Sequence, residues 1–503
     1  MAQQYSVPSG GSVTIPDMRN KRLYVWADIG ASGSATVRGA DGVYLDTRII
    51  LPGGEVYFPT ITVPASAEIV AVGGTVNYSF DPPPRTGDDP SSIDSIARGL
   101  AVRARSDSTA QRRDNRWCGF GQRGVGFTGD AGTDPTNNSF NNWSRHFIPT
   151  GRKLRAIKVA WSRCDINTDG EADRAQDITS FAASLVINNT VHRLFFGGAA
   201  STTITAGRGV LLSDPLWVDS GTATDFVVRA YGAWTGTLKL AATPDSTVLL
   251  TNEACNRGTG LSNRTMDAYD AATPSNSGSG LFCPVAVYGL FDDVTPVVGL
   301  DTDSIGKGTN DTSPTATYGW KGYIQKSLGN ALPWVYTGRG GHRLWYLATR
   351  DDGERSVLME GGITHLILAM VTNDVWIGRT KAEILADIQT VCARYWDYGV
   401  KTYIVTCPPR TTGTYTSAAG QTLYDAVKEP VRLDYNADVR ANWSAYGHSG
   451  LIDMAAVLED PAAPGKWVSS GAVARTTDGV HPNTSGVNNL VSAAIVTPAM
   501  FTL

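Results

Sequence analysis

Four short clusters of polar and glycine residues in the C-terminal part of the chain have the residue types that acyl transfer needs. They are Asp303-Ser304-Ile305-Gly306, Gly338-Arg339-Gly340-Gly341-His342, Asn373-Asp374 and Asp478-Gly479-Val480-His481. A serine hydroxyl is a weak nucleophile until a base accepts its proton, and a histidine oriented by a carboxylate is such a base. The candidate catalytic residues are therefore Ser304 as nucleophile, His481 as base and Asp478 as the group that orients the ring.

Acyl transfer also needs preorganised hydrogen-bond donors for the oxyanion of the tetrahedral intermediate. Three candidate donors are the backbone N–H of Ser304, the backbone N–H of Gly341 and the side-chain amide of Asn373. A glycine in the second cluster lets the backbone approach a substrate closely, and Gly338 and Gly340 are neighbouring candidates for the same role.

The first three clusters each follow a short apolar run, and the fourth comes after two more such runs. The runs are Thr295–Leu300, Pro333–Thr337, Thr364–Met370, Lys401–Thr406 and Gly450–Met454. The segment Lys381–Gly399 has its apolar residues at helical spacing. Alternation of strands and helices predicts a parallel sheet covered on both faces, with ligands beyond the carboxyl ends of its strands. All four clusters are therefore expected on one rim of one sheet, with His342 and His448 lining or flanking the site.

These clusters resemble the four sequence blocks of the SGNH (GDSL-type) hydrolases. The matching segments read VVGLDTDSIGKG, WVYTGRGGHR, MVTNDV and TDGVHPNTSG, and they place Ser304, Gly341, Asn373, Asp478 and His481 on the family's functional positions. The resemblance implies a flavodoxin-like three-layer α/β/α domain over residues 291–503. It also implies a carboxylic ester hydrolase, most simply an acetylesterase, that needs no metal and no organic cofactor.

Two positions depart from the family pattern. Thr302 stands where the family has a glycine before Asp-Ser, and Val371 stands where it has a glycine two residues before the asparagine. Either change is expected to narrow the site, but neither removes a catalytic group.

The remainder of the chain has the alternating pattern of β structure, so the fold class is multidomain β plus α/β. Residues 1–82 are expected to form a small antiparallel β module for attachment or assembly, and residues 83–115 a linker. Residues 116–290 carry many strand-like runs at short spacing, which predicts a β-sandwich of jelly-roll type.

Composition excludes several classes of function. The net charge of −4 and the pI near 5.9 offer no basic face for nucleic acid. No apolar run is long enough for insertion into a membrane. The six cysteines include no CxxC pair, which favours reduced thiols over a zinc site.

One acidic segment has the start of a calcium-loop pattern. Asp165, Asn167 and Asp169 with Gly170 have the required spacing, but Gln176 stands at the twelfth position, where a bidentate Glu is needed. An acidic connection without metal is the favoured interpretation, and calcium is the weaker one.

The substrate and the setting follow only from resemblance. SGNH domains joined to β-sandwiches resemble carbohydrate O-deacetylases, and similar layouts occur in bacteriophage tail spikes and fibres. The first residues carry no signal-peptide pattern, which fits a virion protein made in a host cytoplasm. The leading hypothesis is a virion protein that deacetylates host surface polysaccharide. Its N-terminal module would contact other virion proteins, and a homotrimer is one option for its assembly. The alternatives are a noncatalytic receptor-binding or decoration protein of a virion, and an intracellular bacterial esterase for small acyl esters.

Overall fold

The computed structural model describes part of the N-terminal region and most of the chain after residue 136. The described residues are 4–9, 11–15, 23–27, 32–39, 44–50, 55–58, 65–72, 76–79, 117–120, 133–134, 137–167, 170–173, 177–205, 210–235, 238–239, 250–274, 284–293, 295–349, 357–359, 361–470 and 473–503. Contacts divide the chain into two compact units, Met1–Ser95 and Ile96–Leu503. The predicted linker, 83–115, lies outside the described residues.

The first unit contains two four-stranded antiparallel sheets, ordered β1-β8-β3-β6 and β2-β7-β4-β5. The strands are β1 (Gln4–Val7), β2 (Ser12–Ile15), β3 (Leu23–Ala27), β4 (Ser32–Gly39), β5 (Tyr44–Ile50), β6 (Glu55–Phe58), β7 (Ala65–Val72) and β8 (Val76–Ser79). Buried apolar residues come from both sheets, for example Val7 and Tyr78 from the first and Ile69 from the second.

Two larger antiparallel sheets open the second unit and pack on one another as a β-sandwich. One has the order β16-β15-β20-β11-β22, with β17 beside β15, and the other β18-β12-β23-β9, with β19 beside β12. Their strands are β9 (Cys118–Gly119), β11 (Ser139–Phe147), β12 (Leu154–Ser162), β15 (Ile178–Ile187), β16 (Thr190–Leu194), β17 (Thr202–Ile204), β18 (Val210–Leu212), β19 (Leu216–Trp217), β20 (Asp225–Ala233), β22 (Ala254–Gly258) and β23 (Ala286–Phe291). Both sheets contribute to one apolar cluster, in which Trp161 lies edge-on to Phe181. Two short pairs complete the region, β10 (Thr133–Asp134) with β21 (Leu238–Lys239) and β13 (Cys164–Asn167) with β14 (Gly170–Asp173).

A five-stranded parallel sheet follows, with the order β25-β24-β26-β27-β30. Its strands are β24 (Val298–Thr302), β25 (Trp334–Tyr336), β26 (His365–Ala369), β27 (Lys401–Val405) and β30 (Gly450–Ile452). Numbered along the chain, this is the order 2-1-3-4-5 of flavodoxin-like folds. The five predicted apolar runs all form strands of this sheet, and its carboxyl ends meet at one edge.

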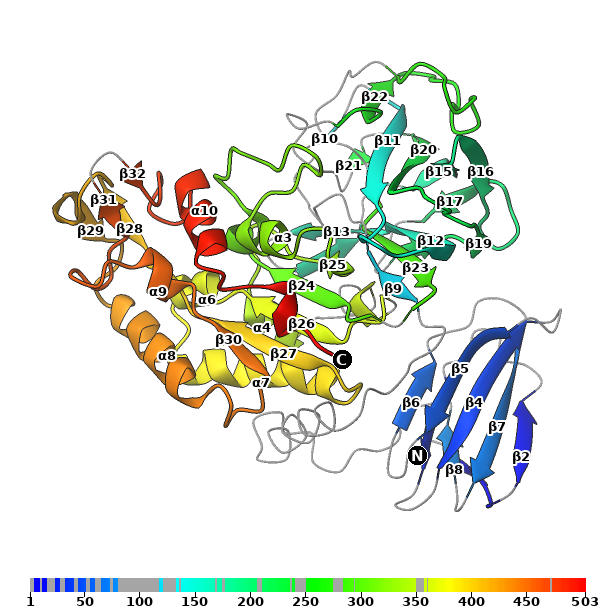
Figure 1. The fold of residues 1–503 in the computed structure, drawn as a ribbon, viewed down its shortest axis with the longest axis horizontal. Coiled ribbons are helices and arrows are strands. Elements are labelled where there is room, and N and C mark those ends of the chain that lie inside the picture. Colours follow the sequence, from blue (N-terminus) through cyan, green and yellow to red (C-terminus); the bar gives the residue numbers. More distant parts are fainter. Residues whose placement is uncertain are drawn as a thin grey trace. The chain divides into compact units, whose positions relative to one another are not determined.

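Helices cover both faces of the parallel sheet, as Figure 1 shows. They are α2 (Ser304–Lys307), α3 (Tyr323–Leu328), α4 (Leu344–Thr349), α6 (Thr372–Ile377), α7 (Lys381–Trp396), α8 (Glu429–Asn442), α9 (Ala455–Leu458) and α10 (Thr484–Ser492), with the 3-10 turns η2 (Ala418–Gly420) and η3 (Pro498–Met500). Side chains alternate between the two faces along each strand. Leu366 and Leu368 of β26 pack with α7 and α8, whereas Ile367 packs with α3 and α10.

Helix α7 forms where helical spacing predicts it. Thr380 and Glu383 make a reciprocal capping box at its start, with the Thr380 N–H donating to Oε2 of Glu383 at 2.8 Å. Its buried residues Ile384, Ile388 and Val391 recur on one face and join the core.

The sandwich and the parallel sheet share a core. Gly119 of β9 donates its N–H to the carbonyl of Gly361 at 2.8 Å, and a Cβ at Gly119 would lie 1.7 Å from a methyl carbon of Val335. Tyr288 of β23 is fully buried and donates its hydroxyl to the carbonyl of Val357 at 3.2 Å. The predicted boundary at 290/291 therefore separates two kinds of sheet but not two independent cores.

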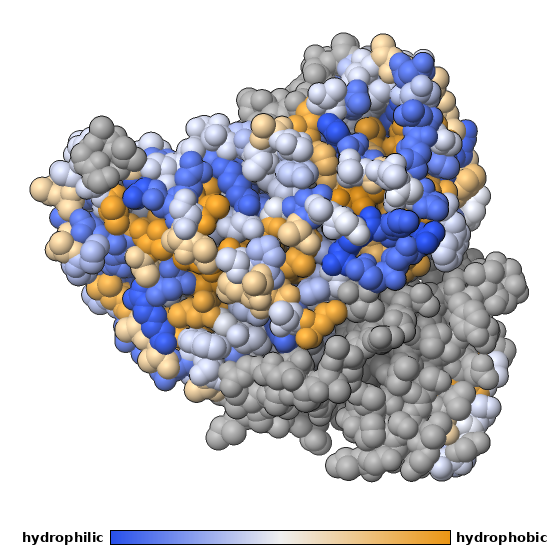
Figure 2. All heavy atoms as spheres, viewed as in Figure 1, coloured by the Kyte–Doolittle hydropathy of each residue, from blue (hydrophilic) through white to orange (hydrophobic). Residues whose placement is uncertain are grey.

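Two small hairpins lie near the carboxyl edge of the parallel sheet. Strand β28 (Thr411–Gly413) pairs with β29 (Gln421–Leu423), and β31 (Ser469–Ser470) pairs with β32 (Val473–Ala474). On the face drawn in Figure 2, hydrophobic residues are interspersed with hydrophilic ones over the α/β part. Among the described residues, no helix has the length and apolar character that crossing a bilayer requires.

Candidate active site

The turn from β24 into α2 positions Ser304. Strand β24 is buried along its length, and Asp303 caps the helix by accepting a hydrogen bond from the N–H of Ile305 at 2.8 Å. Ser304 is the first helical residue and is partly exposed, while Asp303 and Ile305 on either side are buried. The serine side chain is therefore the part of this turn that a substrate can reach.

The structure brings Ser304, His481 and Asp478 together, although Ser304 and His481 are 177 positions apart in the sequence. Nε2 of His481 lies 2.8 Å from Oγ of Ser304, and Nδ1 lies 2.6 Å from Oδ2 of Asp478. With the ring proton on Nδ1, Nε2 of His481 accepts a hydrogen bond from the hydroxyl of Ser304. This is the geometry of a Ser-His-Asp triad, in which the histidine withdraws the proton and the carboxylate fixes the ring.

Hydrogen bonds hold Asp478 in its ionised form. Its Oδ1 accepts the backbone N–H groups of Val480 and His481, each at 2.8 Å, and its Oδ2 accepts the amide of Asn310 at 2.8 Å. Partial burial raises the pKa of Asp478, but the hydrogen bonds from the ring and backbone of His481 and from Val480 outweigh it. The net result is a pKa well below the ordinary value, so the carboxylate stays charged beside the histidine.

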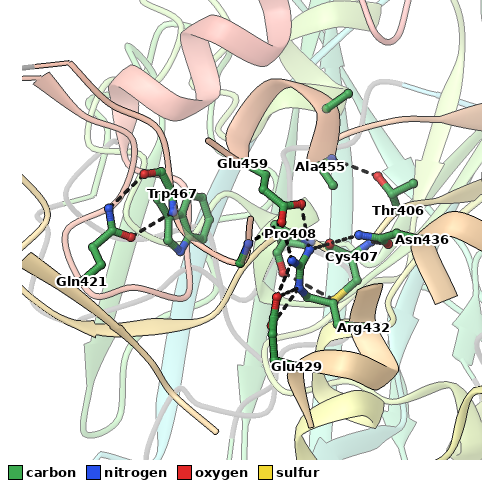
Figure 3. Close-up of polar contacts among 12 residues, drawn as sticks. Thr406, Cys407, Pro408, Gln421, Glu429, Arg432, Asn436, Ala455, Glu459 and Trp467 are labelled. Atoms are coloured by element: carbon green, nitrogen blue, oxygen red, sulfur yellow. Dashed lines mark hydrogen bonds and ion pairs between the residues drawn. The ribbon is translucent and has the colours of Figure 1, made fainter. Parts of the chain in front are cut away.

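The loop that carries Asp478 and His481 is anchored at Gly479. Its φ is +75°, and a Cβ would lie 1.9 Å from the carbonyl oxygen of Thr411, so only glycine fits. The Gly479 carbonyl accepts the N–H of Thr411 at 2.9 Å and the indole N–H of Trp467 at 3.1 Å. The side-chain amide of Gln421 forms two hydrogen bonds with the backbone of Trp467 (Figure 3). Its oxygen accepts the Trp467 N–H and its nitrogen donates to the Trp467 carbonyl, each at 2.9 Å.

The glycine turn that carries the predicted oxyanion donor Gly341 lies beside Ser304. Gly340 and Gly341 form the tip of a turn closed by the His342 N–H on the carbonyl of Arg339, and Gly341 has a φ of +77°. A Cβ at Gly340 would lie 4.0 Å from Cβ of Ser304. The amide of Asn373 donates one hydrogen to the carbonyl of His342 at 2.9 Å, which leaves its second N–H for a ligand.

Asp374 fixes the same loop from the other side, a role that sequence analysis missed. Its carboxyl oxygens accept the N–H groups of Leu344 at 2.9 Å and Trp345 at 3.3 Å, at the start of α4. Asn373 and Asp374 therefore tie the glycine turn to the start of α6 at two points. Asn373 and Asp374 thus hold different parts of one loop, since Asn373 binds the carbonyl of His342 and Asp374 binds the N–H groups at the start of α4.

Replacing Asn373 tests its part in the oxyanion site. We expect Asn373→Ala to lower kcat on p-nitrophenyl acetate by about 10²–10³-fold, because a preorganised donor acts mainly in the transition state. Steady-state kinetics would measure this, with Asn442→Ala on α8 as a control that removes a surface amide bonded to Asp438. A change in KM alone would contradict the assignment.

Burial of Asp374 makes stability depend on pH. Desolvation, opposed by the bonds from Leu344 and Trp345, raises its pKa to about 7, against about 3.9 in an unfolded chain. The folded protein therefore holds a proton that the unfolded chain releases, so the contribution of Asp374 to stability is present below about pH 4 and is lost as the pH rises through about 7. We expect the Tm of Asp374→Asn, minus that of the wild type, to increase between pH 5 and pH 8. Thermal scans measure it, and an unchanged difference would contradict this assignment.

Thr302 and Val371, the two residues expected to narrow the site, are both buried. Thr302 is fully buried, and its hydroxyl lies 2.9 Å from that of Tyr336. A Cβ at Gly306 or Gly338 would lie 2.5 Å or less from a side-chain atom of Thr302, so these glycines accommodate the larger residue. Val371 is 5% exposed and packs in the core with α7. Both side chains are taken up by the interior.

The two additional histidines do not play the same part. His342 is buried beside the glycine turn, with Nδ1 3.6 Å from Oδ1 of Asp301. His448 was expected to line or flank the site, and this is wrong. It bonds Thr402 at the amino end of β27 at 3.0 Å, and since the strands are parallel, it lies at the opposite edge of the sheet from Ser304. Burial lowers the pKa of His448 to about 3.

The candidate calcium residues Asp165 and Asn167 lie in β13, where Asn167 pairs with Gly170 of β14 in an antiparallel hairpin. Asp169 lies outside the described residues, so the structure does not test the weaker, calcium-binding interpretation of this segment. No group of three His, Cys, Asp or Glu within the described ranges is arranged to hold a metal ion. Cys118 is buried, and Cys392 and Cys407 are buried free thiols.

The comparisons with known proteins give a likeness in structure only. No family model and no curated protein match the chain. Similar solved structures include a GDSL-like lipase from Bacteroides thetaiotaomicron, with 16% identity over 40% of this chain and 87% of that chain and a TM-score of 0.29. Another is a member of the lipolytic G-D-S-L family from Veillonella parvula, with 16% identity over 40% and 96% and a TM-score of 0.27. A third is an acetyl-xylooligosaccharide esterase variant from Geobacillus, with 14% identity over 39% and 91% and a TM-score of 0.29. At these identities and TM-scores, the likenesses carry no argument about activity or substrate.

Proposed function

We propose that this protein is a serine esterase that removes O-acetyl groups from carbohydrate. The observation that carries the esterase assignment is the continuous hydrogen-bond path from Oγ of Ser304 through His481 to Asp478, at 2.8 Å and 2.6 Å. A noncatalytic decoration or receptor-binding protein would have no need of this path. The partly exposed positions of Ser304 and His481 keep both groups accessible to an ester on a larger molecule.

The reaction would have two half-steps. Ser304 attacks the acyl carbon while His481 takes the hydroxyl proton, and the oxyanion forms beside the N–H groups of Ser304 and Gly341 and the amide of Asn373. His481 then gives its proton to the leaving alcohol oxygen, which leaves an acyl group on Ser304. Water, deprotonated by His481, attacks this ester, and the acid and free Ser304 are released.

The carbohydrate substrate and the virion setting rest on the resemblance of a β-sandwich joined to this kind of domain. Attachment to other virion proteins through the N-terminal unit and assembly as a homotrimer belong to the same proposal. The shared core of sandwich and parallel sheet supports a rigid body that presents one site to a polymeric substrate.

Release of acetate tests the proposal. The purified protein is expected to release acetate from O-acetylated xylan and to cleave p-nitrophenyl acetate, with little action on p-nitrophenyl palmitate. Cleavage of the palmitate ester without release of acetate from any glycan would overturn the carbohydrate assignment and favour an esterase for other acyl groups.

A further inference from the structure

Three side chains gather on the rim beside the triad, and none of them has a part in the proposed chemistry. The guanidinium of Arg410 lies 4.1 Å from the ring centre of Tyr424 and 5.7 Å from that of Trp376. The rings of Trp376 and Tyr424 meet edge to face, with centres 5.8 Å apart. Trp376 is buried, whereas Tyr424 is 49% exposed, so the tyrosine and the arginine form the outer surface of this cluster.

The cluster spans two elements of the candidate active site. Trp376 lies three residues after Asn373 in α6, and residues at this spacing share one side of a helix. Arg410 precedes Thr411, whose N–H binds the carbonyl of Gly479 in the loop of Asp478 and His481. The cluster therefore adjoins both the amide of the oxyanion site and the catalytic loop.

The backbone of Arg410 is fixed from both sides. Three residues before Arg410, the carbonyl of Cys407 accepts hydrogen bonds from Arg432 at 2.9 Å and from the side-chain amide of Asn436 at 2.8 Å. The backbone N–H of Cys407 donates a hydrogen bond to the side-chain oxygen of Asn436 at 2.7 Å (Figure 3). The carbonyl of Arg410 itself accepts the N–H of Tyr424 at 3.1 Å. Because the backbone here is already ordered, binding of a ligand at Arg410 loses little further conformational entropy.

The charge on Arg410 is not neutralised in the described part of the chain. Its Nε is buried without a hydrogen-bond partner, and none of the described carboxylates forms an ion pair with it. Two nearby cations, in contrast, are paired with carboxylates: Lys428 lies 3.4 Å from Asp425, and Arg379 lies 2.6 Å from Asp387. Arg410 is thus a partly exposed, preorganised cation beside an exposed aromatic ring.

We propose that Arg410 and Tyr424 form a subsite for an acidic sugar, so that the substrate is an O-acetylated glycan that carries carboxylates. The planar guanidinium would bind the carboxylate, and the exposed tyrosine would bind the apolar side of the sugar ring and offer its hydroxyl. This inference deepens the proposed function and rests on it for the acetyl group, but the binding of an acidic sugar can be tested without catalysis.

Substrate preference tests the subsite. The wild type is expected to have a higher kcat/KM for acetate release from O-acetylated polygalacturonate than from O-acetylated xylan. Arg410→Gln is expected to lower the ratio of these two values about tenfold, because it removes one charge-assisted contact. The matched control is Arg440→Gln, which removes a paired surface arginine on α8 and should keep the wild-type ratio. An unchanged ratio in Arg410→Gln, or equal losses on both polymers, would overturn the subsite.

Binding to the inactive Ser304→Ala protein separates this inference from the proposed function. By calorimetry with polygalacturonate free of acetyl groups, we expect Arg410→Gln to weaken binding about tenfold in the Ser304→Ala background, and added salt to reduce the difference. Tyr424→Ala should weaken binding of both polygalacturonate and xylan, because stacking does not depend on charge. Such binding in a protein without esterase activity would sustain the subsite while the proposed function failed. Release of acetate without any Arg410-dependent binding would do the reverse.

Discussion

Ser304→Ala is expected to lower kcat on p-nitrophenyl acetate by roughly 10⁴–10⁶-fold, with the fold unchanged. The side chain is partly exposed and its Oγ bonds Nε2 of His481, so alanine removes the nucleophile without opening a buried cavity. Initial rates of p-nitrophenol release measure the effect, and circular dichroism with a thermal scan checks the fold.

The matched control is Ser313→Ala, an exposed serine of the same α/β part. This variant should keep the wild-type rate and Tm. If Ser304→Ala retained wild-type activity, another residue would be the nucleophile, and the contact with His481 would be incidental.

The second large effect is on stability, at Arg432. This residue is fully buried, and its guanidinium binds Glu429 at 2.5 Å and Glu459 at 2.6 Å, as Figure 3 shows. Arg432→Ala would leave two largely buried carboxylates without a counter-charge, and removing one partner of a buried ion pair costs about 3–5 kcal/mol. Urea unfolding followed by tryptophan fluorescence measures the free energy of unfolding.

The control for Arg432 lies two turns further along the same helix. Arg440 binds Asp453 at 2.8 Å, but both side chains are about a third exposed, so Arg440→Ala is expected to cost about 1 kcal/mol or less. Equal losses in the two variants would show that burial of the Arg432 cluster does not decide its contribution.

Much of the α/β part could be predicted from sequence because its signals are local. The five apolar runs became the five parallel strands, and the segment after Thr380 became α7 with its capping box. Parallel strands carry their signal in continuous apolar runs, and alternation of strand and helix predicts a parallel sheet. The flavodoxin-like strand order was expected only from the family resemblance.

The residues of the candidate site that would take part directly in the reaction could be predicted from the sequence. Ser304, Asp478 and His481 stand in short recognisable segments, and the structure brings them within hydrogen-bond distance. Their catalytic roles stay predictions until activity is measured.

The residues that support the triad were missed because their roles depend on contacts between segments far apart in the sequence. Asn310 binds Asp478 across 168 positions, and Trp467 supports Gly479 through an indole N–H that no local pattern marks. The packing of Thr302 could not be predicted either, because the sequence does not show that Gly306 and Gly338 lie against its side chain. The union of sandwich and sheet around Tyr288 and Val357 was unpredictable for the same reason.

Labelling with a fluorophosphonate tests most directly whether Ser304 is an activated nucleophile. Such a probe phosphonylates a serine whose hydroxyl is deprotonated by a neighbouring base, so reactivity depends on His481 as well as on Ser304. After digestion and mass spectrometry, the wild type should carry the added mass on Ser304, Ser304→Ala should carry none, and His481→Ala should react far more slowly. Failure of the folded wild type to react, or modification at a different serine, would contradict the account.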